Sequence, residues 1–215
     1  MPGKIPDTIW LYRIVHYTNL EFVLRDGMFT KDHPQHDPDY MVIGDNQLIG
    51  QRHDYPVGLA GKGNLGDYVP LYFGPLSVML LNIKTGYRGI TKRPQRDIVY
   101  ICSKMEVFEQ KGLSFVFTDG HAKDLLTNFY TSRDDLKEVD WDIIGAKYWN
   151  NIPEDDTRQR RKQAEFLVHE HMPPDCISAL VVYDQKMLDF ATEIIQRLDM
   201  QVPTYIDSKG KFYYQ

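Results

Sequence analysis

The sequence predicts one α+β domain in which most β-strands are antiparallel. With 215 residues, of which 42% are hydrophobic and 13% aromatic, the chain is long and apolar enough to bury one large core. Short runs of β-branched and aromatic residues alternate with turn signals, and one amphipathic helix lies near the C-terminus. Because the sequence contains no internal repeats and no clear linkers, we expect a single domain over residues 1–215.

The N-terminal part alternates strand, cap and loop signals. Residues 9–16 are rich in aromatic and β-branched residues and predict a strand, and residues 20–25 predict a short helix after a Thr-Asn capping signal. The Asp-, His- and Pro-rich residues 30–46 predict a long loop. Residues 67–75 predict a strand that its prolines place at a sheet edge or a bulge. Residues 76–83 fit either a helix or a continuation of that strand.

The middle of the chain contains a strongly apolar strand signal. Residues 97–102 predict a buried strand, followed by a short helix over residues 103–110 and another strand over residues 113–117. After a turn, residues 122–130 predict a helix. Residues 131–163 show a partly helical pattern that ends in a charged loop.

The C-terminal part begins with two apolar runs. Residues 166–168 predict a short buried strand, and residues 178–183 give the clearest strand signal in the chain. Residues 186–200 carry apolar residues at helical spacing and predict an amphipathic helix. Residues 202–206 and 211–214 predict a closing hairpin.

Charge and cysteine content limit the classes of function. The net charge of −5 argues against a protein that binds bulk duplex DNA through a strongly basic surface. Two cysteines, Cys102 and Cys176, in a chain without a signal peptide predict a reducing, cytoplasmic location. No apolar run approaches the roughly 18 residues of a membrane span, so we expect no membrane contact.

Three other kinds of chemistry are poorly supported. His169 and His171 would share one face of a strand, but no further ligands follow at zinc-site spacing, so we expect no metal. A restriction-type nuclease would need an acid or a lysine two residues after Glu165, where Leu167 stands. The glycine-rich residues 58–66 lack the Gly-Lys-Ser/Thr ending of a phosphate-binding loop.

Glu165 is the carboxylate that most needs an explanation. The basic run of residues 158–163 changes abruptly at Glu165 into an apolar run, which predicts a loop entering a buried strand. A carboxylate at such an entrance can face a cleft while its neighbours hold the backbone still, as catalysis requires. The alternative is an ordinary salt bridge between Glu165 and an adjacent arginine.

Several further motifs occur in a fixed order around Glu165. They are Arg13-Ile-Val-His16, Asn19, Gly27, Ile43-Gly-Asp45, Leu48-Ile49, Arg52, Tyr68-Val-Pro-Leu-Tyr-Phe73, Val116-Phe-Thr-Asp-Gly120, Trp141 and Arg161-Lys-Gln-Ala-Glu-Phe-Leu-Val-His169. Over nearly the whole chain these motifs resemble the DarT family, the DNA ADP-ribosyltransferase toxins of DarT/DarG toxin–antitoxin pairs. Leu71 stands where the family usually has Phe, which is a conservative departure.

The resemblance implies an ADP-ribosyltransferase fold, with a split antiparallel β-sheet core, flanking helices and NAD+ as co-substrate in a central cleft. It implies transfer of ADP-ribose to N3 of thymine in single-stranded DNA, in a preferred sequence context and without a metal. A macrodomain antitoxin of the DarG type is the implied partner that reverses the modification.

The resemblance also assigns roles to residues. It implies that Glu165 and Arg52 are catalytic, that residues 36–54 fold over the cofactor, and that residues 119–164 present the DNA. The implied NAD+ contacts are His16, Tyr17, Thr18, Gly27, Arg52, Tyr68 and Tyr72. Bases that stack on aromatic rings and phosphates that meet arginines would give the DNA contacts Tyr72, His121, Arg158, Arg160, Arg161 and Arg96, with Arg93 beside Arg96.

Two alternatives remain open at this point. An enzyme of the same chemistry could modify a protein or an RNA, because the acceptor is chosen by the shape of the loops. A catalytically silent nucleic-acid-binding module could also use this fold. The presence of both Glu165 and Arg52 argues against a silent module.

Overall fold

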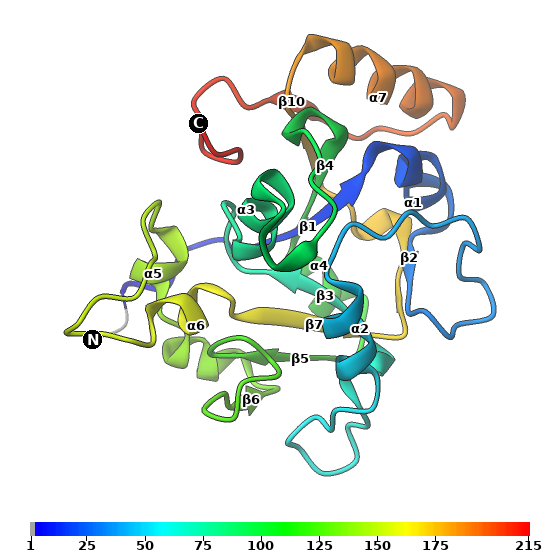
Figure 1. The fold of residues 1–215 in the computed structure, drawn as a ribbon. Helices are drawn as coiled ribbons and strands as arrows, with labels where there is room; N and C mark the ends of the chain where they lie inside the picture. The colour runs from blue at the N-terminus through cyan, green and yellow to red at the C-terminus, as the bar shows by residue number, and fades with distance from the viewer. Residues whose placement is uncertain (1–2) are drawn as a thin grey trace.

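The computed structural model describes residues 3–215 (Figure 1). The strands are β1 (Trp10–His16), β2 (Met28–Phe29), β3 (Tyr68–Tyr72), β4 (Ile98–Lys104), β5 (Phe115–Thr118), β6 (Phe129–Tyr130), β7 (Glu165–His169), β8 (His171–Met172), β9 (Ala179–Val182) and β10 (Thr204–Ile206). The α-helices are α1 (Leu20–Asp26), α2 (Asn46–His53), α3 (Val78–Thr85), α4 (Met105–Gln110), α5 (Trp141–Gly145), α6 (Arg158–Lys162) and α7 (Gln185–Arg197). Short 3-10 helices span Tyr17–Asn19, Leu65–Asp67, Tyr87–Gly89, Gln95–Asp97, Arg133–Glu138 and Pro174–Cys176.

One large sheet organises the fold. Its eight strands follow the order β10-β9-β4-β1-β3-β7-β5-β6, while β2 and β8 form a separate two-stranded sheet. All neighbouring strands of the large sheet are antiparallel except β9 and β10, which are parallel. This arrangement confirms the predicted α+β fold with mostly antiparallel strands.

The large sheet is split between β1 and β3. These two strands pair at one register position, where Tyr12 faces Tyr72. Pro70 has no N–H to donate to β1, and its carbonyl oxygen accepts a hydrogen bond from Nη1 of Arg13 at 3.1 Å. The sequence predicts that the prolines of this strand mark a sheet edge or a bulge. The prediction of an edge is wrong for Pro70, because β3 lies between β1 and β7 inside the sheet. Its proline is tolerated because Pro70 borders the split.

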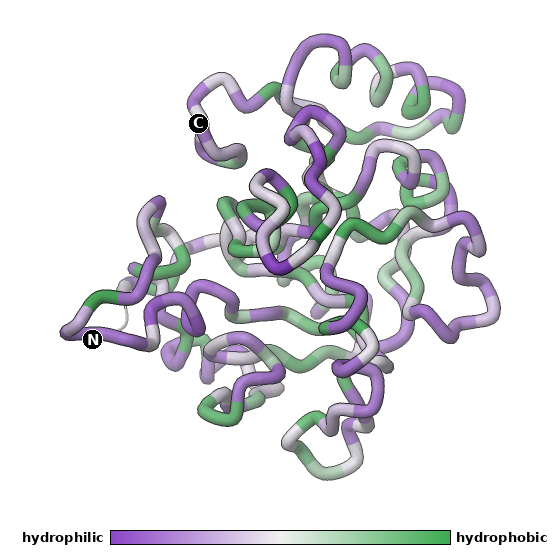
Figure 2. The backbone as a smooth tube through the Cα atoms, in the orientation of Figure 1, coloured by the Kyte–Doolittle hydropathy of each residue, from purple (hydrophilic) through white to green (hydrophobic). Residues whose placement is uncertain are grey.

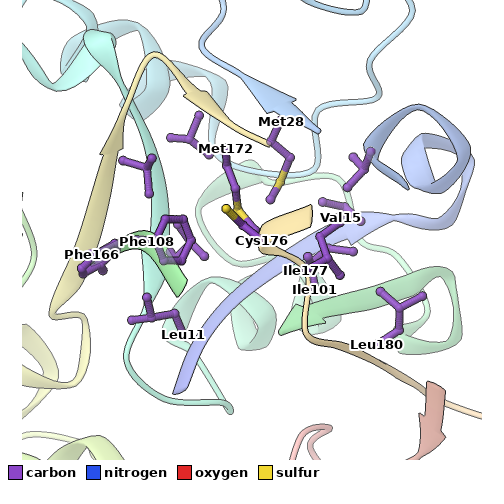
Figure 3. Packing of buried hydrophobic residues seen from close by; sticks show 14 of the residues in the cluster. Leu11, Val15, Met28, Ile101, Phe108, Phe166, Met172, Cys176, Ile177 and Leu180 are labelled. Carbon is purple, nitrogen blue, oxygen red and sulfur yellow. The ribbon is translucent and has the colours of Figure 1, made fainter. Parts of the chain in front are cut away.

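The main core lies on one face of this sheet. Helices α1, α4 and α7 cover that face and bury leucines, valines and aromatic rings against β1, β4, β7 and β9. Figure 3 shows part of this packing, with Phe108 of α4 near Phe166 of β7. In Figure 2, α7 alternates hydrophilic and hydrophobic colours along its turns, as its predicted amphipathic pattern requires.

The opposite face of the sheet carries the candidate site. Helix α3 and the C-terminal residues cover its β1–β4–β9 half, with Leu80, Ile83 and Tyr213 buried against Tyr100. Residues 76–83, which the sequence left undecided, are therefore largely helical. Helix α2 lies over the β3–β7 half and has no buried residue, which explains why apolar periodicity did not predict it as a helix.

Residues 122–130 do not form the predicted helix. The Asp119 carboxylate accepts hydrogen bonds from the backbone N–H of Asn128 at 3.1 Å and from its side-chain amide at 3.0 Å. These bonds close a loop whose end, β6, pairs with β5. Leu125 and Leu126 are 92% and 67% exposed. The two leucines thus do not form the buried apolar face that a packed helix would have.

The predicted C-terminal hairpin is also wrong. Strand β10 pairs in parallel with β9, and residues 211–214 form no strand. The Asp207 carboxylate instead accepts hydrogen bonds from the backbone N–H groups of Lys211, Phe212 and Tyr213 at 2.8 to 3.0 Å. This carboxylate turns the chain back without a paired strand.

The two histidines around Glu170 do not share a strand face as expected. Glu170 has a φ of 57°, which turns the chain between β7 and β8. The ring of His169 lies against Tyr68, whereas that of His171 stacks on Phe29. Across residues 3–215, no group of three or more His, Cys, Asp or Glu side chains could hold a metal ion.

The two cysteines form no disulfide bond with each other. Cys102 and Cys176 are both free and buried. Among the described helices, none is long and apolar enough to cross a membrane.

Candidate active site

Glu165 is held at the first position of β7 by backbone contacts on both sides. It faces Tyr72 of β3 in the antiparallel register. Its backbone N–H donates to the hydroxyl of buried Thr118 at 2.9 Å, and that hydroxyl donates to the Gly120 carbonyl at 2.7 Å. The Glu165 side chain is 2% exposed. The fold therefore fixes this carboxylate on a rigid strand beneath the loop that begins at residue 119.

Arg52 of α2 reaches across the sheet to Glu165. Its Nη1 donates to Oε1 at 2.9 Å and its Nη2 donates to Oε2 at 2.7 Å, which is a bidentate ion pair. Oε1 also accepts the backbone N–H of Ala122 at 2.9 Å. Arg52 is 14% exposed at its side chain. Two residues that are 113 positions apart in the sequence thus form one buried charged centre.

Both members of this pair are ionised. Burial works against the ionised carboxylate, but the Arg52 guanidinium outweighs it and lowers the pKa of Glu165. Burial would likewise lower the pKa of Arg52, but the Glu165 carboxylate raises it above its ordinary value. Glu165 therefore provides a fixed negative charge and Arg52 a fixed positive charge, neither of which exchanges protons at neutral pH.

Tyr72 and His121 lie beside the ion pair. Burial, reinforced by the Glu165 carboxylate, raises the pKa of Tyr72 to about 12, so its hydroxyl keeps its proton. Burial lowers the pKa of His121, although Glu165 pulls it in the opposite direction. His121 is therefore neutral at neutral pH, and its Nδ1 accepts the backbone N–H of Lys123 at 3.3 Å. The structure thus brings together Arg52, Glu165, Tyr72 and His121.

His16 and Thr18 lie at the end of β1, on the other side of the split. His16 Nδ1 and the Thr18 hydroxyl are 2.8 Å apart, and burial lowers the pKa of His16. The Tyr17 ring packs edge-on against Phe190 of α7, with centroids 5.5 Å apart. His16 and Thr18 are therefore joined in one polar turn, whereas Tyr17 contributes its ring to the core.

Gly27 and Tyr68 have structural contacts of their own. Gly27 has a φ of 89°, and a Cβ at this position would lie 2.2 Å from the Met172 carbonyl oxygen. The Tyr68 hydroxyl donates to the Lys62 carbonyl at 2.7 Å. Tyr68 also sits four positions along β3 from Tyr72, roughly 13 Å away at the usual strand rise. The structure does not bring Tyr68 to the ion pair.

The arginines of α6 are occupied by partners within the chain. Arg160 pairs with Asp119 at 3.0 Å, and Arg161 pairs with both Asp140 and Asp155. Arg158 donates to the carbonyl oxygens of Asn150 and Tyr148 at 3.1 and 3.0 Å. These side chains hold together the loop from residue 119 to residue 164. Arg96 is exposed in the 3-10 helix Gln95–Asp97, just before β4 and far from α6 in the sequence.

Sequence reasoning missed the positioning roles of Asn19 and Thr118. The Asn19 amide donates to the Met41 carbonyl and accepts the Met41 N–H, both at 2.9 Å, so it anchors the long loop to α1. The sequence indicated Asn19 as a helix cap, but its side chain makes no capping hydrogen bond. Both residues lie inside the family motifs, which is the signal that could have identified them.

Comparison with known proteins shows which family this chain resembles. The family model described as "ssDNA thymidine ADP-ribosyltransferase, DarT" matches residues 12–214. A DNA ADP-ribosyl transferase of Escherichia coli O127:H6 is 36% identical over 201 residues, which cover 93% of this chain and 92% of the relative. A fusion of DNA ADP-ribosyl transferase and DNA ADP-ribosyl glycohydrolase from Thermosipho africanus is 25% identical, over 91% of this chain and 48% of the fusion protein.

Solved structures of DarT from Thermus sp. 2.9 have the same fold. The complex of that protein with ADP-ribosylated ssDNA superposes with a TM-score of 0.87 and 28% identity, over 99% of this chain and 100% of the other. Its complex with NAD+ gives a TM-score of 0.80 and 29% identity, over 98% and 100%. The family match over almost the full length, together with these structures, shows that this chain belongs to the DarT family of single-stranded DNA thymidine ADP-ribosyltransferases.

Proposed function

We propose that this chain transfers ADP-ribose from NAD+ to N3 of thymine in single-stranded DNA, with Glu165 and Arg52 as the catalytic residues. The buried bidentate pair between them, next to the split of the sheet, is the observation that carries the proposal. Its chemistry agrees with family membership and with the NAD+ and modified-DNA complexes of the Thermus relative.

Glu165 acts on the sugar of NAD+. Breaking the bond between the nicotinamide nitrogen and C1′ releases neutral nicotinamide and leaves positive charge on the ribose. A buried, ionised carboxylate stabilises that charge in the transition state more than in the ground state. Glu165 would also accept a hydrogen bond from the ribose 2′-hydroxyl. Its lowered pKa keeps it ionised for this task.

Arg52 acts on the thymine. N3 carries a proton and becomes nucleophilic as that proton passes to a water molecule, after which N3 forms the new bond to C1′. A guanidinium beside the ring stabilises the developing negative charge on the base. Its raised pKa supports an electrostatic role rather than proton removal by Arg52. Glu165 and Arg52 would have to separate in part for the two substrates to enter.

The other residues of the site divide by their contacts. His16, Thr18 and Tyr72 have polar groups around the split and fit NAD+ contacts. Tyr17, Gly27 and Tyr68 fit a supporting role for the same pocket, because each packs within the protein. On the DNA side, His121 and Tyr72 fit contacts to the base, and Arg96 is free for a phosphate. Arg158, Arg160 and Arg161 would reach DNA after exchanging a partner within the chain.

We also propose a partner protein and a cellular location for this chain. The Thermosipho relative joins a DNA ADP-ribosyl glycohydrolase to its transferase, which supports a macrodomain antitoxin of the DarG type as the partner that removes the modification. One ADP-ribosyltransferase domain over residues 1–215, a preferred DNA sequence and a cytoplasmic location complete the proposal.

The test is a reaction of the purified protein with NAD+ and short oligonucleotides of varied sequence, single- and double-stranded, analysed by mass spectrometry. An ADP-ribose adduct confined to thymine in single strands is expected. Consumption of NAD+ without a DNA adduct would indicate a protein or RNA acceptor. Intact NAD+ together with unmodified DNA would indicate a silent binding module.

A further inference from the structure

The segment from residue 84 to residue 96 is an unbalanced basic region. It contains Lys84, Arg88, Lys92, Arg93 and Arg96 and no acidic residue. Lys84 donates to the carbonyl oxygens of the last two residues of the chain. Within residues 3–215, the other four cations form no ion pair with a carboxylate. This region therefore differs from α6, where Arg160 and Arg161 are each neutralised by aspartates.

Arg93 is held in place by its neighbours. Its backbone N–H donates to the Ile83 carbonyl at 3.0 Å. Gln95 exchanges two hydrogen bonds with the backbone of Tyr214, at 2.7 and 2.9 Å. The chain then enters β4 at Ile98, which faces His16 of β1 in the register. The segment is thus fixed to the fold on the His16 side of the split.

The Arg93 side chain lacks a partner for a buried nitrogen. Its Nε is enclosed by protein and makes no hydrogen bond. An enclosed donor without an acceptor is costly, and more so when it is charged. Arg93 also acts electrostatically on His16: burial lowers the pKa of His16, Arg93 lowers it further, and Asp97 opposes both. Nε itself is shielded from solvent, so an anion beside His16 would be bound by the terminal Nη groups of the same guanidinium, which are not enclosed.

We propose that Arg93 forms a phosphate-binding site beside His16, which takes a phosphate group of a nucleotide substrate. The proposal rests on the proposed function, since that function requires two substrates with phosphates. The phosphate belongs either to the diphosphate of NAD+ or to the DNA backbone, and guanidinium recognition is the same for both. Lys92 and Arg96 are exposed on either side of Arg93 and add to the positive field.

The experiment compares Arg93→Gln with Arg88→Gln, a matched loss of charge at an exposed residue of the same segment. Dissociation constants are measured by titration with ADP-ribose and with a thymine-containing single-stranded oligonucleotide, so that no turnover is needed. Loss of a hydrogen bond to a charged group predicts at least about 10-fold weaker binding of one ligand for Arg93→Gln. Arg88→Gln should stay within about twofold, and Arg93→Lys should recover most of the affinity because it keeps the charge.

The ligand that weakens identifies the source of the phosphate. Weaker binding of ADP-ribose alone assigns the NAD+ diphosphate. Weaker binding of the oligonucleotide assigns the DNA backbone. In that case the slope of log affinity against log salt concentration should also fall in magnitude by about one, as expected for the loss of one phosphate contact. Unchanged binding of both ligands by a folded Arg93→Gln variant would overturn the site. The proposed function and the phosphate site can fail separately. If Arg93→Gln weakens the binding of one ligand but the wild-type protein transfers no ADP-ribose, the proposed function fails and the phosphate site stands.

Discussion

Helix α2 and strand β7 contribute the two halves of the proposed catalytic pair, but the fold holds them very differently. In β7, Glu165 and the three residues after it are 0 to 2% exposed, and the strand is paired on both sides. Helix α2 has no buried residue. Its contacts come from side chains near its C-terminal end: Arg52 pairs with Glu165, Gln51 contacts Lys123, and His53 lies 3.4 Å from Asp32 and packs against Gly66.

This difference separates a fixed part of the site from a movable part. The carboxylate must meet a short-lived charge at one position, and a strand with a packed core provides that precision. The arginine lies on a helix without a buried residue, so the helix can move aside when substrates enter with little loss of apolar burial. The site therefore combines a fixed carboxylate on β7 with a movable guanidinium on α2.

The largest effect is expected from Glu165→Gln. The amide keeps the size of the side chain but removes the charge that stabilises the ribose. Transfer to thymine should fall by about 100- to 1,000-fold, the usual size of a lost electrostatic contact in a transition state. The rate of adduct formation by mass spectrometry measures it. Glu138→Gln, at an exposed position, is the control for loss of charge and should keep full activity.

Arg52→Met should give the largest change in stability and should reverse its pH dependence. In the wild type the pKa of Glu165 is lowered from 4.5, so its stabilisation is present above pH 4.5 and is lost as the pH falls further. Without Arg52, burial dominates and raises this pKa, so stability should fall as the pH rises above 4.5. At pH 7 the cost should be about 3 to 5 kcal/mol.

Denaturant unfolding of both proteins at pH 4.5 and pH 7 measures this effect. The difference in free energy of unfolding between wild type and Arg52→Met should shrink toward pH 4.5, where Glu165 can take up a proton. An equal difference at both pH values would show that Glu165 is not held as a buried anion.

An intermediate effect is expected from Thr118→Val. The substitution removes the hydroxyl that accepts the Glu165 N–H and donates to the Gly120 carbonyl, and both groups are left buried. The free energy of unfolding should fall by about 1 to 3 kcal/mol, and transfer should fall with it because Glu165 shifts. Thr118→Ser retains the hydroxyl and should restore both values. If Val and Ser behave alike, the hydroxyl does not position Glu165.

The smallest effect is expected from Asp45→Ala, which removes the N-cap of α2. Asp184→Ala is the matched control, because Asp184 caps α7 through the same kind of hydrogen bond. Each change should cost about 1 kcal/mol of helix stability. Only Asp45→Ala should raise the KM for the single-stranded oligonucleotide, by a few-fold, because it loosens the helix that carries Arg52. Equal kinetics of the two variants would contradict a kinetic role for α2.

Elements that are stabilised by buried apolar side chains could be predicted from the sequence, and elements that are stabilised by polar contacts could not. Residues 9–16, 97–102 and 178–183 are buried strands whose apolar runs are visible in the sequence, and α7 shows its helical period. Helix α2, the loop of residues 122–130 and the turn at Asp207 depend on caps and side-chain hydrogen bonds instead. Such local polar contacts leave no periodic signal in the sequence.

The candidate site shows the same limit. The change from basic to apolar residues predicts Glu165 as a carboxylate at a strand entrance, and Glu165 is the first residue of β7. The alternative prediction of a salt bridge is also confirmed, because Glu165 forms one with an arginine. The partner is Arg52, however, and not an adjacent arginine. Long-range pairing of this kind arises from the sheet order, which local patterns do not contain. For the same reason the pairing of Arg160 with Asp119, 41 positions away, could not be predicted.

The most direct test of the proposed division of work is to measure NAD+ hydrolysis and transfer to thymine in parallel for wild type, Glu165→Gln and Arg52→Met. Glu165→Gln should lose both activities to a similar extent, because both require charge stabilisation on the ribose. Arg52→Met should lose transfer by at least about 10-fold more than hydrolysis, because only transfer develops charge on the base. An equal loss of both activities in folded Arg52→Met, assayed at a pH where Glu165 stays ionised, would place Arg52 on NAD+ and contradict its proposed role at the thymine.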